Sequence, residues 1–383
     1  MKVLLINNFS ENFLVGGVEN YLLEFTQFVK KNNRNINFYW YGKDSKKSHW
    51  IQKFYNYKTT KEIIKLIDEF QPNVIHCFSI GAPVTPHFMK HAKEKNIPIL
   101  YSFRDYYYIC PKNYMLTTRG DIITSHKNGL ACVFNHYPKK NLLYDTLLYC
   151  KQSYHKKFIK KYANYFLTPS DNLTETIKNN FKLHGETLSN PTMLKNDESI
   201  NTSEDYMLYV GRLDKEKGVL TLLKAFQNIL LNHPNEKLLI VGEGNQMEEL
   251  VHYKNKHSLK NVVFLGKRDR NQLKEIYSKA KFVIIPSEFL ESYCNVVLEA
   301  FAFRKTAIIS NLLGITKDVE ESNSGLVFPF GNIELLTESI ELLLNNTALK
   351  KKLENNGLAF AKTRNFENHF NKQIEIYNRL LQS

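Results

Sequence analysis

The amino-acid sequence predicts an α/β protein made of two doubly wound, Rossmann-like domains that face each other across a cleft. The chain has 383 residues, which is more than one hydrophobic core usually serves. Short apolar runs alternate with longer amphipathic stretches, a pattern typical of a parallel sheet with helices on both faces. A polar segment at residues 184–203 interrupts this alternation, which then starts again.

The N-terminal domain is expected to span residues 1–188. Its strands are expected at residues 3–6, 36–41, 74–78, 97–101 and 165–168. Its helices are expected at residues 18–29, 61–70, 84–95, 142–162 and 171–181. Residues 105–140 contain Pro, Gly and Asn with little periodicity, so this stretch is expected to be a long functional loop or a small excursion.

Residues 189–203 are the expected linker, and residues 204–364 the expected C-terminal domain. Its strands are expected at residues 207–210, 238–241, 262–265, 282–285, 307–310 and 325–328. Its helices are expected at residues 219–231, 246–257, 271–279 and 295–302, followed by two further helical stretches. A last helix within residues 365–383 carries aromatic residues at helical spacing and is expected to pack back on the N-terminal domain. Ligands of such sheets bind at the carboxyl ends of the strands.

The composition restricts the cellular setting. No apolar run approaches the roughly 20 residues that a membrane span needs, and the apolar start turns polar at Asn7, too early for a signal peptide. The cysteines are odd in number and widely spaced, which argues against a disulfide framework and favours the cytoplasm. We interpret all five as small, partly buried side chains: Cys77, Cys110, Cys132, Cys150 and Cys294.

The net charge of +14 is concentrated in the first half of the chain. Residues 1–190 contain 27 Lys and Arg against 14 Asp and Glu. This excess suggests an anionic partner, which could be a membrane surface, a phosphorylated acceptor or a nucleic acid. The alternative is that the lysines are simply solvated.

The most informative motif runs from a strand end into a helix at residues 286–300. Glu291 precedes the expected helix and Glu299 lies inside it, on the order of 12 Å away at the rise of a helix. That separation is too large for the paired carboxylates of a glycosidase. It suits two carboxylates that hold two parts of one long ligand. The backbone amides of residues 293–296 would point out of the start of this helix, where they could bind an anion. The alternative, an amphipathic helix with exposed Glu, fits poorly because Glu299 stands among apolar residues.

A second motif, Gly211 to Gly218, follows another strand. Arg212 and Lys217 could converge on a diphosphate, the arginine as a bidentate fork. Two fixed cations could stabilise a departing diphosphate without a metal. The alternative is a basic loop at the surface.

Together the two motifs resemble those of glycosyltransferase family 4, which has the GT-B architecture. The resemblance covers nearly the whole chain. The other motifs that follow the family's order are Gly16-Gly17-Val18-Glu19, Asn73-Val74-Ile75-His76, Ser102-Phe103-Arg104-Asp105-Tyr106, Thr168-Pro169-Ser170, Ser189-Asn190-Pro191, Val241-Gly242-Glu243-Gly244 and Phe264-Leu265-Gly266.

The resemblance implies a role for each motif. Arg212 and Lys217 would bind the diphosphate of a nucleotide-sugar donor, Glu291 would contact the transferred sugar, and Glu299 would hold the ribose hydroxyls. The remaining donor contacts that it implies are Gly16, Gly17, Gly211, Gly242, Gly266, Lys267, Arg268, Ser292, Tyr293, Cys294, Asn295 and Val296. The family retains the anomeric configuration and usually needs no metal, so neither a metal nor a cofactor is expected.

On the acceptor or sugar side, the resemblance points to His76, Arg104 and Asp105. The family commonly has His where Arg104 stands. Arginine does not deprotonate and cannot serve as a base, but it could bind a sugar hydroxyl or a phosphate. An ion pair with Asp105 is the alternative. Asn190-Pro191 replaces the usual Asn-Gly, which is expected to affect only the shape of the linker.

The expected function is a retaining glycosyltransferase that moves a sugar from a nucleotide-diphosphate sugar to a glycan or lipid-linked acceptor. The expected setting is synthesis of a cell-envelope polysaccharide such as capsule, O-antigen or exopolysaccharide. The alternatives are a catalytically silent sugar-nucleotide-binding module and a transferase acting on nucleic acid or protein. A nicotinamide-dependent dehydrogenase is excluded because no G-x-G-x-x-G follows the first strand. A nucleic acid is not the expected partner.

The helix expected at residues 142–162 bears on localisation. Its lysines could rest on an anionic membrane surface: Lys156, Lys157, Lys160 and Lys161. Tyr154, Phe158 and Tyr162 make an apolar stripe that is expected to pack against the N-terminal sheet. The expected location is cytoplasmic, peripheral on the inner face of the membrane.

Overall fold

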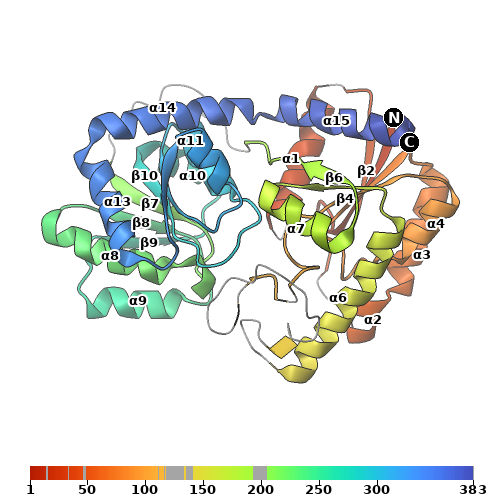
Figure 1. The fold of residues 1–383 in the computed structure, drawn as a ribbon, viewed down its shortest axis with the longest axis horizontal. Helices are drawn as coiled ribbons and strands as arrows, with labels where there is room; N and C mark the ends of the chain where they lie inside the picture. Colours follow the sequence, from red (N-terminus) through yellow and green to blue (C-terminus); the bar gives the residue numbers. More distant parts are fainter. Residues whose placement is uncertain are drawn as a thin grey trace. The chain divides into compact units, whose positions relative to one another are not determined.

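The chain forms two compact units in the computed structural model (Figure 1). Unit 1 comprises Met1–Ser189 and Phe366–Ser383, and unit 2 comprises Asn190–Asn365. The structure describes residues 1–13, 16–32, 34–45, 49–110, 112–115, 117, 133–134, 141–192 and 205–382. Most of the expected loop at 105–140, Cys132 and most of the expected linker lie outside these residues.

Unit 1 is built on a six-stranded parallel sheet of order β2-β1-β3-β4-β5-β6. Its strands are β1 (Lys2–Phe9), β2 (Asn37–Lys43), β3 (Val74–Phe78), β4 (Ile99–Ser102), β5 (Tyr165–Thr168) and β6 (Gly185–Thr187). Its helices are α1 (Gly17–Lys31), α2 (Trp50–Phe54), α3 (Tyr57–Phe70), η1 (Pro86–Phe88), α4 (Met89–Glu94), α6 (Leu142–Tyr162), α7 (Asp171–Phe181) and α15 (Phe366–Gln382).

Unit 2 has a second six-stranded parallel sheet, of order β12-β11-β10-β7-β8-β9. Its strands are β7 (Tyr206–Val210), β8 (Leu238–Val241), β9 (Val262–Gly266), β10 (Ala280–Ile285), β11 (Ala307–Ser310) and β12 (Gly325–Phe328). Its helices are η2 (Lys215–Lys217), α8 (Val219–Asn232), α9 (Met247–Lys256), α10 (Arg270–Lys279), α11 (Asn295–Ala302), α12 (Thr316–Glu321), α13 (Ile333–Asn345) and α14 (Thr347–Thr363). The predicted fold class, two doubly wound α/β sheets, is therefore confirmed.

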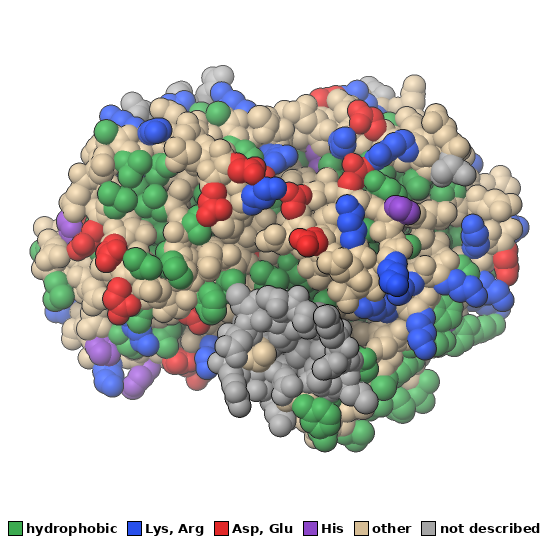
Figure 2. Space-filling model, in the orientation of Figure 1, with side chains coloured by type: hydrophobic (Ala, Val, Ile, Leu, Met, Phe, Trp, Pro, Cys, Tyr) green, Lys and Arg blue, Asp and Glu red, His purple; other side chains and the backbone are tan. Residues whose placement is uncertain are grey.

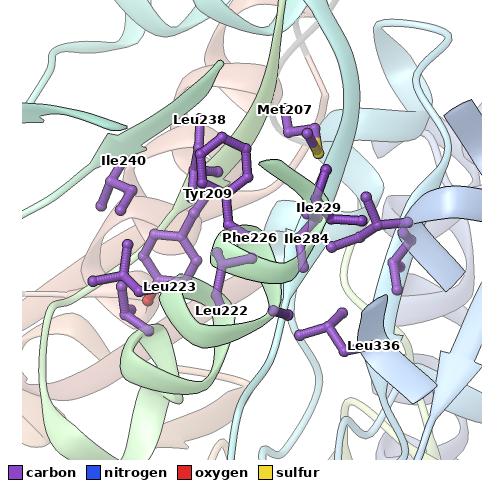
Figure 3. Packing of buried hydrophobic residues seen from close by; sticks show 14 of the residues in the cluster. Met207, Tyr209, Leu222, Leu223, Phe226, Ile229, Leu238, Ile240, Ile284 and Leu336 are labelled. Carbon is purple, nitrogen blue, oxygen red and sulfur yellow. The ribbon is translucent and has the colours of Figure 1, made fainter. Parts of the chain in front are cut away.

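Each face of the unit 2 sheet carries its own apolar core. Met207 and Tyr209 of β7 point to one face and pack with Phe226 of α8, as Figure 3 shows. Leu208, between them, points to the other face and packs with Phe301 of α11. Both faces of the strand are thus buried, which explains why the strands of this sheet read as continuous apolar runs and not as alternating patterns.

Both sheets contain a reversal of strand order. In unit 2 the chain runs outward from β7 through β8 to β9, and then returns to β10 on the other side of β7. In unit 1 the chain runs from β1 to β2 and returns to β3 on the other side of β1. Loops that leave the two strands at such a reversal diverge and open a crevice at the carboxyl ends. Two crevices of this kind, one in each unit, are therefore built into the fold.

Helix α15 is attached to unit 1 by a buried hydrogen-bond network. The His369 Nε2 atom lies 2.7 Å from the Tyr21 hydroxyl, and the Tyr377 hydroxyl lies 2.7 Å from the His76 Nδ1 atom. Gln373 connects both halves, since it accepts from Tyr21 and donates to Tyr377. Burial holds the pKa of His76 well below its usual range and lowers that of His369 to about 3. Both imidazoles are therefore neutral, as a dry network requires.

Three expectations about individual elements are wrong. Residues 185–187, read as part of a polar boundary, form β6, an edge strand that needs no apolar run because its side chains are only half-buried. Helix α6 rests on α2, η1 and α4, and its Tyr154 is 40% exposed, so the stripe of Tyr154, Phe158 and Tyr162 does not pack on the sheet. Cys150 is exposed on the same helix.

Candidate functional site

The loop after β7 is shaped by a glycine. Gly218 has φ +68°, and a Cβ on it would lie 2.0 Å from the carbonyl oxygen of Pro286, which follows β10. Only glycine combines this left-handed conformation with such a close approach. The contact brings the loops after β7 and β10 together at the strand-order reversal of unit 2.

A charged contact at this reversal joins the two predicted motifs. The Lys217 ammonium lies 3.0 Å from the Glu291 carboxylate, and the two side chains are 16% and 12% exposed. Ser287 donates a hydrogen bond to the same carboxylate oxygen. The Lys217 ammonium also lies 4.9 Å from the centre of the Phe289 ring. A mostly buried, oriented ion pair therefore stands where the crevice opens.

Arg212 lies on the same loop but points outward. Its guanidinium pairs with Asp214 and lies 3.5 Å from a Glu216 oxygen, while its own side chain is 61% exposed. The two carboxylates are largely buried, and Asp214 is held in place by the amide of Asn245 at 3.1 Å. The Arg212 side chain is thus exposed and pairs with largely buried carboxylates, whereas the Lys217 side chain is mostly buried.

Helix α11 begins beside this pair in a strained conformation. Its N-cap, Cys294, has φ +135°, which is a costly value for a residue with a side chain. Burial, with the neighbouring Glu291 charge, raises the pKa of the Cys294 thiol well above its usual range. The next residue, Asn295, accepts a 2.8 Å hydrogen bond from the Asn190 amide. Backbone strain of this kind is typical of functional sites.

Glu299 stands one turn inside α11. It accepts a 2.8 Å hydrogen bond from the Tyr277 hydroxyl. Burial raises its pKa from 4.5 to about 7, although the Tyr277 hydrogen bond and the Arg270 charge act in the opposite direction. The carboxyl group therefore titrates near neutral pH, which is common among groups that bind or react.

Four further predicted donor contacts lie at the ends of β8 and β9: Gly242, Gly266, Lys267 and Arg268. Gly242 has φ +139°, and a Cβ there would lie 1.8 Å from the carbonyl oxygen of Gly211. The Gly242 amide donates to the Gly266 carbonyl at 3.0 Å. Lys267 follows as an exposed side chain and Arg268 as a half-buried one. The backbones of the loops after β7, β8 and β9 are therefore in direct contact, and main-chain groups lie at the carboxyl edge of the sheet.

The unit 2 residues fall into those that sequence reasoning found and those that it missed. It placed Lys217 and Glu291 at strand ends, and the structure brings them together. It missed Ser287, Tyr277 and Asn190, which bond directly to Glu291, Glu299 and Asn295. Ser287 lies inside the quoted motif and could have been found there. Tyr277 lies on α10 and carries no local signal.

Unit 1 contains a cavity of about 380 Å³ at its own strand-order reversal. The ends of β1, β3 and β4 contribute Asn8, Ser79 and Arg104 to its wall, and Asp105 lines it as well. Asn8, which sequence reasoning missed, accepts hydrogen bonds from three amides of the loop after β3 at 3.2–3.3 Å. The Arg104 guanidinium lies 4.4 Å from the centre of the Tyr21 ring.

His76 and the two early glycines do not form part of the wall described for this cavity. His76 is fully buried, with its Nε2 atom 2.7 Å from the Ser102 hydroxyl and its Nδ1 atom bonded to Tyr377. The expectation that His76 lies on the sugar side is wrong, because β3 continues past it to Phe78 and α15 covers it. Gly16 caps α1, where its amide donates to Glu19, and Gly17 is the first residue of that helix.

Comparison with known proteins finds similarity to glycosyltransferases. Residues 192–360, nearly all of unit 2, match the model of the family described as Glycosyl transferases group 1. A segment of 174 residues is 32% identical to an alpha-1,4-N-acetyl-D-galactosaminyltransferase of Campylobacter jejuni, named for a glycan on PP-undecaprenol. That segment covers 44% of this chain and 47% of the relative. The chain spans about half the length of the curated relatives it matches.

Solved structures share the whole fold. A glycosyltransferase of Rickettsia africae superposes with a TM-score of 0.71 at 15% identity, over 100% of this chain and 99% of that one. HepE of Anabaena, solved in complex with UDP, superposes with a TM-score of 0.68 at 14% identity, over 99% of this chain and 100% of that one. The architecture is therefore the GT-B fold.

Proposed function

We propose that the protein is a retaining glycosyltransferase that moves a sugar from a nucleotide-diphosphate sugar to a glycan or lipid-linked acceptor, in the synthesis of a cell-envelope polysaccharide. The observation that carries the proposal is the ion pair of Lys217 and Glu291 at the strand-order reversal of unit 2. Arg212 and Glu299 flank it from the same two motifs. The relatives support the class, since one acts on a lipid-linked glycan and another binds UDP.

In this proposal the diphosphate of the donor binds to Lys217 and Arg212. The exposed Arg212 guanidinium can leave Asp214 and form a bidentate contact with phosphate oxygens. Lys217 is already oriented, so it can stabilise the charge that develops on the departing diphosphate at little cost in reorganisation. Glu291, held by Ser287, then contacts the transferred sugar.

Glu299 holds the ribose of the donor in this proposal. Its Oε2 atom is engaged by Tyr277, which leaves the other oxygen to accept from a ribose hydroxyl. A hydrogen bond to the ionised form favours that form, so ribose binding would lower the Glu299 pKa from its value of about 7. The enzyme would use positive charge from side chains and need no metal or cofactor.

The outer faces of α2 and α6 support attachment to a membrane surface. Exposed apolar side chains gather on them, among them Ile51 at 65% and Leu143 at 69% exposure. Figure 2 shows such side chains grouped over the region of these helices in unit 1. Lys157, Lys160 and Lys161 are exposed on α6. None of the helices in the described part of the chain is long and apolar enough to cross a bilayer. Apolar side chains beside lysines suit an interface with anionic lipids.

A thermal-shift screen over nucleotide-diphosphate sugars, followed by a transfer assay, tests the donor proposal. A ligand that binds only the folded state raises the unfolding temperature. We expect one donor to raise it in the parent chain and to do so much less in Lys217→Ala. Retention of the anomeric configuration in the product supports the mechanism. Binding without turnover over a panel of glycan and lipid acceptors would instead show a silent binding module.

Flotation with vesicles tests the membrane proposal separately. We expect binding to anionic vesicles at low salt, weakened by high salt and by Lys157, Lys160 and Lys161 changed together to Glu. Ile51→Ser with Leu143→Ser should weaken it too. Leu231→Ser is the matched control, because Leu231 is 81% exposed in unit 2. Equal recovery with neutral and anionic vesicles would remove the membrane claim and leave the transferase claim intact.

A further inference from the structure

The unit 1 cavity contains a buried cation without a counter-charge. Lys151 of α6 lines the cavity and is only 6% exposed. Its ammonium lies 5.1 Å from the centre of the Tyr107 ring, and within the described ranges no carboxylate lies within ion-pair distance of it. Burying an ammonium in this way costs free energy that a counter-ion would recover.

Two further cations line the same cavity. Lys53 comes from α2, which packs against α6 through the backbone carbonyl of Phe54, 2.8 Å from the His155 ring. Burial, with a smaller effect of the Lys53 charge, lowers the pKa of Lys151 to about 8. Arg104 reaches the cavity from the end of β4. Three separate elements of unit 1 therefore direct positive charge to one space.

The two carboxylates in the cavity wall already have other partners. Glu19 accepts from the Asn7 amide at 2.6 Å and from the Gly16 backbone amide at 2.9 Å. Asp105 accepts from the backbone amide of Tyr107 at 3.0 Å. These bonds hold the carboxylates in place, and neither carboxylate forms an ion pair with Lys151, so the Lys151 charge faces the cavity.

We propose that this cavity binds a phosphate group of the acceptor through Lys151, Lys53 and Arg104. The proposal rests on the proposed function and names its acceptor class, a phosphorylated glycan or a lipid-linked phosphate. Three cations from different directions suit the three oxygens of a dianionic phosphate, whereas one arginine fork already satisfies the two oxygens of a carboxylate. The volume, about 380 Å³, exceeds that of a phosphate, and the walls include Phe9 and Tyr108, which can pack on a sugar ring.

Calorimetric titration with glucose 1-phosphate tests the site. The parent for this test carries Lys217→Gln and Arg212→Gln, so that neither cation proposed for the donor can contribute. Adding Lys151→Met should weaken binding by about tenfold or more, the usual effect of losing one charged hydrogen bond. Lys178→Met removes the same charge from an exposed position of α7, outside the cavity wall, and should leave the affinity unchanged. Glucose, the neutral probe, should bind far more weakly than glucose 1-phosphate.

Thermal unfolding provides a second measurement on the same variants. Since Lys151→Met removes an unpaired buried charge, it should not lower the unfolding temperature, and glucose 1-phosphate should no longer raise it. If that variant fails to fold, Lys53→Met takes its place, because Lys53 is only half-buried. Equal affinity of the Lys151 and Lys178 variants, or equal binding of glucose and glucose 1-phosphate, overturns the proposal.

A polyprenyl phosphate in detergent micelles distinguishes the two sources of the phosphate. Displacement of glucose 1-phosphate by the lipid assigns the site to a lipid-linked acceptor, and binding of the soluble probe alone assigns it to a phosphorylated glycan. Binding of neither overturns the site. The donor proposal has a separate test, since absence of nucleotide-sugar turnover would contradict it. Phosphate binding at Lys151 does not depend on that result.

Discussion

The strand-order reversals of the two units differ in how their charges are compensated. In unit 2, Lys217 faces Glu291 at 3.0 Å and Arg212 pairs with Asp214, so each cation has an internal partner. In unit 1, Lys151 is more deeply buried and has no carboxylate partner among the described residues. A ligand of unit 2 must replace a carboxylate, whereas a ligand of unit 1 supplies the missing charge. The match to the family model, at residues 192–360, lies almost wholly in unit 2.

The largest effect is expected from the enclosed cation of unit 2. Lys217→Ala and Glu299→Ala should each lower kcat/KM for transfer by about 100-fold or more, since each removes positioning or charge stabilisation. Lys215→Ala, an exposed side chain on the same loop, is the control and should stay near the parent rate. Parent rates in both variants would contradict the donor site.

A smaller effect is expected from Arg104 in unit 1. Arg104→Gln should raise the KM for acceptor by about tenfold, because a charged hydrogen bond to the acceptor is lost. The KM for donor should stay unchanged if the two reversals serve different substrates. A rise in the KM for donor alone would contradict the assignment of the two reversals to different substrates. An unchanged KM for both substrates would show that Arg104 only packs against Tyr21.

The pH dependence should separate the two sites further. Glu299 has a folded pKa of about 7, above its ordinary value of 4.5, so its ionised form destabilises the fold. Stability from this group is fully present below pH 4.5 and is lost as the pH rises to 7. Nucleotide binding should run in the opposite direction and weaken a few-fold as the pH falls from 8 to 6. Glu299→Gln should flatten that profile in calorimetric titrations, and an unchanged slope would exclude the ribose role.

The smallest effect is expected from chelation. Transfer should survive EDTA, because Lys217 and Arg212 can supply the charge that a metal would otherwise bring to the diphosphate. Within the described residues, no three His, Cys, Asp or Glu side chains gather in a way that could hold a metal ion. Loss of transfer on chelation, with recovery on adding Mg²⁺ or Mn²⁺, would contradict this assignment.

The sequence was informative where both faces of an element are buried. Strands β3 and β11, buried throughout, were predicted at the bounds that the structure shows, since a short apolar run is a local signal. Strand β6 was missed because an edge strand is only half-buried. The strand order, and with it the two reversals, depends on pairing between distant segments and could not be read from local patterns.

The same division applies to the sites. Lys217 and Glu291 follow recognisable strand ends, so their motifs could be found, although their contact could not. His76 also stands near a strand end, but its burial depends on Tyr377, far along the chain. In the sequence, nothing distinguishes Lys151 from the other lysines of the same basic helix. Its burial results from the packing of α2 and η1 against α6, which no local pattern records.

Helix α15 has a consequence for the order of events during synthesis. The Tyr21 hydroxyl and the His76 Nδ1 atom of unit 1 also bond to residues of α15, which is made after all of unit 2. At the usual rates of translation, about 5–20 residues per second, that delay is on the order of ten seconds. During it, the emerging first unit holds these two polar groups without their α15 partners. Unit 2 is continuous in sequence, so its core can form before the core of unit 1, which needs the C-terminal helix α15.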